Sequence, residues 1–168
     1  TVNGNAQYDA FGSSLDALGA DINSDGREDF LVGAPGVSVT DSLEGSVRVV
    51  SGLNGNTIYE VFGQDQGWEL GHDVSAAGDC NNDTVADFIA GAPEASENGG
   101  ASGLVRAYSG SDGGMLWEVQ GSGGNHRFGF SVSEFTDING DNFDDVLVGS
   151  TGQGVAVLSG SNGGVLAT

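Results

Sequence analysis

The residues in this sequence best suited to chemistry are aspartates, and they gather in three short stretches with one pattern. Residues 21–29, 79–87 and 137–145 each read Asp-x-Asn-x-Asp-x-x-x-Asp. Ca²⁺ is a hard cation that prefers about six to eight oxygen ligands. Side-chain oxygens at positions 1, 3, 5 and 9 of such a loop, with the backbone carbonyl of position 7, can surround one ion. The pattern therefore predicts three calcium ions per chain.

The predicted ligands all offer an oxygen atom, and each occupies one of the five ligand positions of its loop. They are Asp21, Asn23, Asp25, Arg27 (carbonyl), Asp29, Asp79, Asn81, Asp83, Val85 (carbonyl), Asp87, Asp137, Asn139, Asp141, Phe143 (carbonyl) and Asp145. Asx residues also cap turns, but turn capping does not require three carboxylates in every loop. Magnesium prefers fewer protein carboxylates, and zinc and most transition metals would favour His, which no loop contains.

Position 6 of each loop must bend sharply, which favours residues that tolerate left-handed backbone. Gly26 and Asn142 meet this requirement, whereas Thr84 is β-branched and would be strained there. We therefore expect the middle loop either to bind calcium more weakly or to follow a different path.

Composition limits the partners of the chain. The 168 residues include 24 acidic and 4 basic side chains, a formal charge of -20, which repels nucleic acids and anionic lipids. No stretch approaches the roughly 20 apolar residues of a membrane-spanning helix, so membrane insertion is not expected. The 31 glycines against 2 prolines are typical of short-stranded all-β proteins. The single Cys80 cannot form an internal disulfide and is expected to fill space.

The aspartate loops belong to a longer repeat, since Asp21, Asp79 and Asp137 are spaced 58 residues apart. An aromatic or aliphatic residue followed by Gly precedes each loop, and an apolar run ending in Gly follows it. A β-branched run ending in Ser-Gly comes next, and a fourth run follows a turn. The pairs before the loops are Phe11-Gly12, Leu70-Gly71 and Phe128-Gly129.

Four short strands per repeat, with no helical period, predict an all-β fold of three four-stranded antiparallel β-propeller blades. The expected blades span residues 8–63, 67–121 and 125–168 of a single segment, 1–168. Residues 1–4 are expected to finish the outer strand of a preceding blade.

The order Phe-Gly, Asp loop, then an apolar run ending in Gly-Ala-Pro resembles the FG-GAP repeats of integrin α-subunits and bacterial relatives. The departures are Leu70, Thr84 and Ser150-Thr151. The resemblance implies that the calcium loops join the first two strands of each blade and stiffen it. It also implies that partners bind the opposite face, at residues 63–69 and 121–127 and at the loops after Pro35 and Pro93.

On that implied partner face, Trp68 is expected to pack between blades, and His126 and Arg127 are expected to be solvated. The alternative is that these three side chains contact a partner.

The resemblance implies an extracellular or cell-surface module for protein binding and adhesion, in which calcium is structural. A catalytic role is not expected, because His72 and His126 are the only histidines and no Ser-His-acid motif is present. The alternatives are a lectin-like propeller that binds glycans and an accessory domain of a secreted enzyme. The chain shows no signal peptide, as in the mature form of a secreted protein.

Three blades cannot close a propeller, which needs about four to eight. The repeat alignment places Thr1 and Thr168 opposite the same position of the first repeat, Glu60. We therefore expect a head-to-tail homodimer of six blades, with the faces of the first and third blades at its interfaces. The alternative is that the chain is part of a longer propeller.

Overall fold

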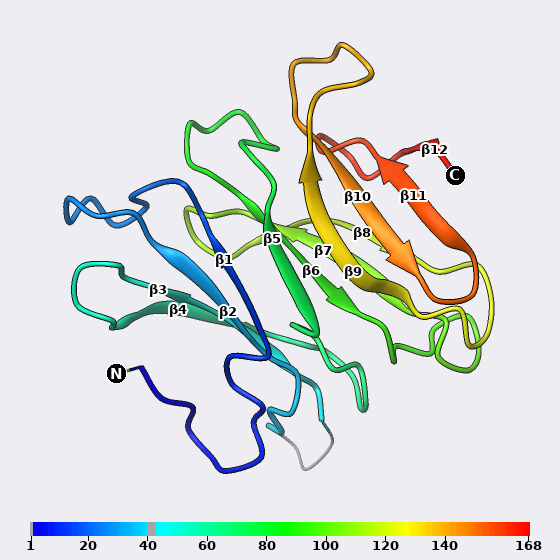
Figure 1. Cartoon of the computed structure of the whole chain (residues 1–168), viewed down its shortest axis with the longest axis horizontal. Coiled ribbons are helices and arrows are strands. Elements are labelled where there is room, and N and C mark those ends of the chain that lie inside the picture. Colours follow the sequence, from blue (N-terminus) through cyan, green and yellow to red (C-terminus); the bar gives the residue numbers. More distant parts are fainter. Residues whose placement is uncertain (1, 40–42) are drawn as a thin grey trace.

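Three β-sheets lie side by side in the computed structural model, which describes residues 2–39 and 43–168 (Figure 1). Within each sheet four strands follow one another in chain order, and neighbouring strands are antiparallel. The described residues form no helix, and they therefore include no helix that could cross a membrane. The predicted all-β architecture of four-stranded propeller blades is confirmed.

The three sheets are called the first, second and third blade. The first contains β1 (Ser14–Ala17), β2 (Phe30–Ala34), β3 (Ser46–Val50) and β4 (Thr57–Phe62). The second contains β5 (Asp73–Ala76), β6 (Phe88–Ala92), β7 (Leu104–Tyr108) and β8 (Met115–Gln120). The third contains β9 (Phe128–Phe135), β10 (Asp145–Ser150), β11 (Gly154–Leu158) and β12 (Val165–Ala167). Residue 1 of the expected outer strand and residues 40–42 of the loop after Pro35 lie outside the described residues.

Apolar side chains fill two cores, one at each junction between neighbouring blades. Val47 of the first blade and Phe88 of the second belong to one core, and Ile89 and Val146 belong to the other. Because side chains alternate along a strand, the adjacent residues Phe88 and Ile89 serve opposite faces of β6. The strands β6 and β7 are consequently buried along their whole length.

Backbone hydrogen bonds also join the blades. The Leu70 N–H donates to the Glu44 carbonyl at 3.1 Å, and the Phe128 N–H donates to the Ser102 carbonyl at 3.0 Å. Leu70 and Phe128 are the residues before Gly that open the second and third repeats. These pairs therefore mark the points where one blade attaches to the blade before it.

The expectation that Trp68 packs between blades is confirmed. Its side chain is 3% exposed and belongs to the core between the first and second blades. The guanidinium of Arg106 lies 4.4 Å from the centre of its ring. Trp68 is thus a packing residue with almost no surface to offer a partner.

Candidate metal centre

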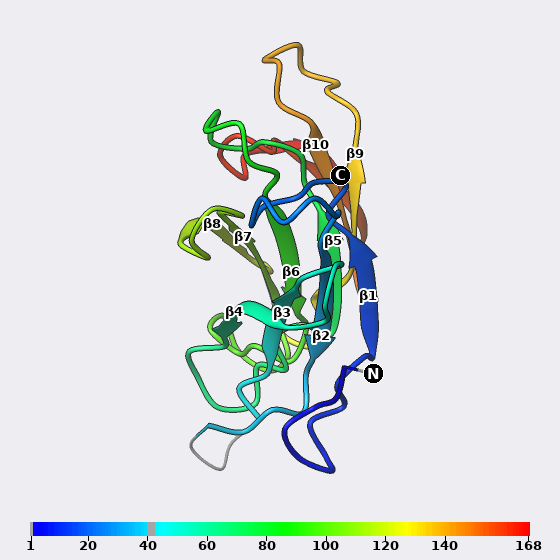
Figure 2. The same ribbon diagram turned by 90° about the vertical axis from the view of Figure 1, so that its left-hand side faces the viewer.

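The three aspartate loops occupy equivalent places in the three blades. Each joins the first strand of its blade to the second, and all three project from the same side of the array (Figures 1 and 2). The antiparallel pairing of these two strands fixes the ends of each loop. In the first blade, Ala17 pairs with Phe30, directly after Asp29.

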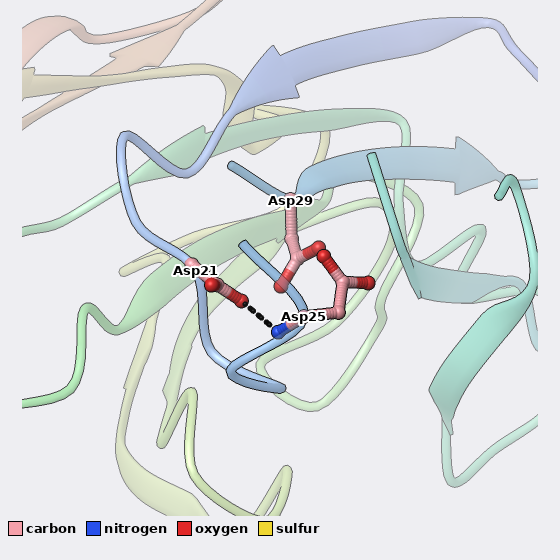
Figure 3. A group of neighbouring side chains, drawn as sticks. All are labelled: Asp21, Asp25 and Asp29. Carbon is pink, nitrogen blue, oxygen red and sulfur yellow. Dashed lines mark hydrogen bonds between the residues drawn. The ribbon is translucent and has the colours of Figure 1, made fainter. Parts of the chain in front are cut away.

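In the first loop the three carboxylates converge. One carboxylate oxygen from each of Asp21, Asp25 and Asp29 lies within 4.8 Å of the other two, and Figure 3 shows these side chains on the inner side of the loop. Asp29 is 1% exposed and forms the buried end of the group. Three carboxylates at this separation repel one another, so the arrangement fits a cation between them.

Backbone N–H groups hold the carboxylates in place, and the pattern repeats in all three loops. The position 1 carboxylate accepts a hydrogen bond from the position 6 N–H, which comes from Gly26 at 2.7 Å, Thr84 at 2.8 Å and Asn142 at 2.9 Å. The position 9 carboxylate accepts a hydrogen bond from the position 2 N–H at 2.7 to 2.9 Å. The loops therefore share one backbone scaffold.

The second and third loops differ from the first in how their side chains lie. The amides of Asn81 and Asn139 each donate to the position 5 aspartate of their own loop at 3.0 Å. Across residues 2–39 and 43–168, only the first loop brings three carboxylates within 4.8 Å. The carbonyls of Arg27, Val85 and Phe143 remain predicted ligands in all three loops.

The bend at position 6 is left-handed in every loop. The φ angle is 93° at Gly26, 70° at Thr84 and 71° at Asn142. The middle loop thus follows the same path as the others, and the alternative of a different path is wrong. Thr84 accepts a backbone conformation that a β-branched residue rarely adopts, held in place by its hydrogen bond to Asp79.

Each loop has a second left-handed residue, at position 4, that was not predicted from the sequence. The φ angle there is 59° at Ser24, 61° at Asn82 and 79° at Gly140. Asn82 and Gly140 are residue types that tolerate left-handed backbone, so they could have indicated this second bend.

Hydrogen bonds and burial act in opposite directions on the loop carboxylates. The Ser51 hydroxyl holds the pKa of Asp25 below its usual value, and backbone N–H groups do the same for Asp83 and Asp141. Burial raises the pKa of Asp87 to about 6, although the N–H groups of Gly110 and Cys80 donate to it. The ion pairs among the described residues all lie outside the three loops. Carboxylates that form no ion pair fit a hard divalent cation.

Comparison with known proteins identifies the repeat. The FG-GAP repeat family matches residues 11–50, which run from the first Phe-Gly pair through the first loop to the end of β3. The chain belongs to the FG-GAP repeat family.

Integrin α-chains are similar to this FG-GAP chain over most of its length. It is 31% identical to integrin alpha pat-2 of Caenorhabditis elegans over 83% of its residues, and 34% identical to integrin alpha-4 of Xenopus laevis over 88%. It is 33% identical to integrin alpha-E of Mus musculus over 94%. The chain spans only 13 to 15% of the length of these relatives.

The Ser-Gly pair at the end of the third strand of each blade is also part of the site. From the sequence it was predicted only to end the strand. The first such pair, Ser51-Gly52, directly follows β3 and contacts the first loop. The Ser51 hydroxyl donates to Asp25 at 2.6 Å, and the Gly52 N–H donates to Asp29 at 3.1 Å. The pairs Ser109-Gly110 and Ser159-Gly160 contact their own loops in the same way. Recurrence of Ser-Gly in all three repeats was the available signal.

These Ser-Gly turns require glycine because the backbones approach closely. A Cβ on Gly52, Gly110 or Gly160 would lie 1.8 to 1.9 Å from a carbonyl oxygen near the end of the adjacent loop. The approach lets the glycine N–H reach the buried position 9 carboxylate.

Two other side chains, Cys80 and Arg127, behave as expected, and His126 does not. Cys80 is 4% exposed, and burial raises the pKa of its thiol to about 12, in keeping with a space-filling role. Arg127 is largely solvent-exposed and pairs with Glu94 at 2.9 Å. The expectation that His126 is solvated is wrong, because its side chain is half-buried and its Nδ1 atom is shielded from solvent. Its backbone carbonyl accepts a hydrogen bond from the Ser150 hydroxyl at 2.6 Å.

Proposed function

We propose that the chain is a calcium-binding propeller segment in which three structural calcium ions each stiffen one blade. The observation that carries this proposal is the convergence of Asp21, Asp25 and Asp29, together with the same backbone scaffold in the other two loops. The ligands would be the side chains at positions 1, 3, 5 and 9 and the carbonyl of position 7. A bound ion would neutralise the mutual repulsion of the carboxylates.

The chain's own residues would do the positioning. The Asp29 carboxylate already accepts N–H groups from both the loop and the Ser-Gly turn, so it ties the β1–β2 connection to the end of β3. Asp87 and Asp145 have the same two kinds of donor in their blades. A cation held by these carboxylates would link three strands of one blade.

Calorimetric titration of chelated protein with calcium tests the proposal. For dissociation constants of about 10⁻⁴ M, millimolar calcium adds about 1.4 kcal/mol of stability per site. We expect saturable uptake, a higher unfolding temperature with calcium, and a smaller response to magnesium. No heat of binding and no thermal shift would overturn the proposal.

We propose, further, that the segment is a non-enzymatic binding module of an extracellular or cell-surface protein. This rests on its similarity to integrin α-chains, and those relatives are much longer than this chain. The face away from the calcium loops would bear the partner site, at residues 63–69 and 121–127 and the loops after Pro35 and Pro93. Probing protein and glycan arrays in parallel tests this proposal. Signals restricted to proteins would support it, and signals restricted to glycans would overturn it.

The third blade has an apolar face that we propose is covered by another blade. Val47 and Val105 pair with equivalent glycines of the first and second blades and are fully buried, whereas their counterpart Val155 is 58% exposed. At the other end of the array, Gly12 has no atom within 4 Å of its Cβ position among the described residues, while Gly71 lies against the Ser46 carbonyl. We propose that a second copy fills both places and completes a six-bladed ring, with blades at residues 8–63, 67–121 and 125–168.

Light scattering in millimolar calcium tests this assembly. We expect a dimer that Val155→Arg converts to a monomer, while Val39→Arg, at an exposed loop residue outside that face, leaves it intact. A stable native monomer would overturn the dimer and favour cover by further blades of a longer polypeptide.

A further inference from the structure

Two aromatic side chains reach from one blade to the Ser-Gly turn of the next. The Tyr59 hydroxyl on β4 donates to the Gly110 carbonyl at 2.8 Å and to the Ser109 carbonyl at 3.2 Å. The Trp117 Nε1–H on β8 donates to the Gly160 carbonyl at 2.7 Å. Tyr59 and Trp117 occupy equivalent places in their strands, opposite Val49 and Ala107. Two different residue types thus make the same contact at two successive junctions.

The turns that receive these hydrogen bonds are the turns that hold the position 9 aspartates. The Gly110 N–H donates to Asp87 at 2.9 Å, and the Gly160 N–H donates to Asp145 at 3.3 Å. Ser109 C=O and Gly110 N–H belong to one peptide group, so a donor on the oxygen polarises the N–H toward Asp87. At the first junction a hydrogen-bonded path therefore runs from Tyr59 through one peptide group to Asp87, and at the second junction Trp117 and Asp145 bind the C=O and the N–H of the same residue, Gly160.

The aromatic rings also support the turns sterically. A Cβ on Gly113 would lie 3.0 Å from the Tyr59 ring, and a Cβ on Gly163 would lie 2.9 Å from the Trp117 ring. Burial and the carboxylates of Asp87 and Asp112 raise the pKa of Tyr59, which further favours the protonated hydroxyl that donates to the turn. Ring and donor together fix the position of the turn over the loop.

We propose that Tyr59 and Trp117 are positioning residues that make calcium binding in the second and third loops depend on packing of the preceding blade. This inference rests on the proposed calcium sites. Because coupling is reciprocal, calcium in a loop would also strengthen the junction with the blade before it. The second and third sites would then each be linked to the blade that precedes them, and the first site would not.

The first loop provides an internal comparison. At the corresponding turn, the side chain of Val2 lies 3.0 Å from the Cβ position of Gly55, and valine has no hydrogen-bond donor. Within residues 2–39 and 43–168, no side chain donates to the Gly52 carbonyl. Affinity at the first loop should therefore be insensitive to substitutions at positions 59 and 117.

Site-resolved calcium titration of the full chain by NMR tests the proposal, with the backbone amides of Gly26, Thr84 and Asn142 reporting the three loops. Tyr59→Phe keeps the ring and removes the donor, and the net value of one hydrogen bond predicts about a fivefold loss of affinity in the middle loop alone. Trp117→Phe should weaken the third loop alone by a similar factor. Tyr8→Phe, which removes the hydroxyl of a residue that is 83% exposed, is the matched control.

A variant that restores calcium affinity can show whether Tyr59 positions the turn or only stabilises the fold. Tyr59→Trp restores a donor of the kind used at Trp117 and should return the middle loop to within about twofold of its native affinity. Unchanged affinity in Tyr59→Phe, or an equal loss at all three loops, would overturn the inference while leaving the calcium sites intact. An absence of calcium-dependent shifts in the native chain would overturn both proposals.

Discussion

Gly33 of the first blade lies directly against Gly71, the residue that opens the second blade. A Cβ on Gly33 would come within 2.1 Å of the Gly71 carbonyl oxygen. The next junction repeats the contact, because a Cβ on Gly91 would come within 1.9 Å of the Gly129 carbonyl oxygen. The glycine that ends one apolar run and the glycine after Phe or Leu in the following repeat thus meet between blades.

Gly91→Ala should therefore open the junction between the second and third blades. Its Cβ would meet backbone atoms of Gly129, which cannot rotate away, and we expect a loss of about 3 kcal/mol of unfolding free energy. Gly149→Ala in the Val155→Arg background, which removes the proposed junction with a second copy, is the control at the equivalent place in the third blade, where the nearest atom of the chain itself is the rotatable Ser131 hydroxyl. Urea unfolding of both variants measures the difference, and equal losses would contradict the interblade explanation.

Thr84→Gly should strengthen the middle loop. Threonine pays a conformational penalty of about 1 to 2 kcal/mol at positive φ, which glycine does not. We expect tighter calcium binding at this loop, by about fivefold, and a higher unfolding temperature. Thr57→Gly, at an exposed strand residue without positive φ, should instead lower stability. Weaker binding in Thr84→Gly would show that the Thr84 side chain contributes to the site.

Arg106→Ala should destabilise the second blade. The Arg106 side chain is 3% exposed, pairs with Glu118 at 2.7 Å and stacks on Trp68. In the third blade Ala156 occupies the equivalent strand position and lines a cavity of about 430 Å³. Removing Arg106 would leave a void in the second blade and remove the ion pair of Glu118, whose carboxylate would keep its hydrogen bond from the Gln120 amide, at a cost of about 3 kcal/mol.

Arg127→Ala is the control for that substitution. The Arg127 pair with Glu94 is solvent-exposed, so its loss should cost less than about 1 kcal/mol. Chemical denaturation measures both variants. Comparable losses of unfolding free energy in Arg106→Ala and Arg127→Ala would mean that burial does not increase the contribution of the Arg106–Glu118 ion pair to stability.

Local features of the fold could be predicted from the sequence because each is encoded within a few residues. The β-branched runs predicted the strands, and glycine or asparagine predicted the left-handed bend at Gly26 and Asn142. Contacts between repeats could not be predicted in this way. Tyr59 and Gly110 meet only because one blade packs on the next, and nothing near Tyr59 in the sequence marks its hydroxyl as a donor to that turn.

Within the loops, too, local features could be predicted from the sequence and tertiary contacts could not. The spacing of Asp21, Asp25 and Asp29 predicted that they would share a loop, and the structure brings their oxygens together. The role of Ser51-Gly52 depends on the return of β3 over the loop, which is a tertiary relationship.

Native mass spectrometry can count the calcium ions that each chain binds and so tests whether every loop is a metal site. Single substitutions of the buried position 9 aspartates, Asp29→Asn, Asp87→Asn and Asp145→Asn, each remove one charged ligand while keeping the side-chain shape. We expect three ions bound to the native chain in millimolar calcium and two in each variant. A native chain that binds no calcium, or variants that bind as many ions as the native chain, would contradict it.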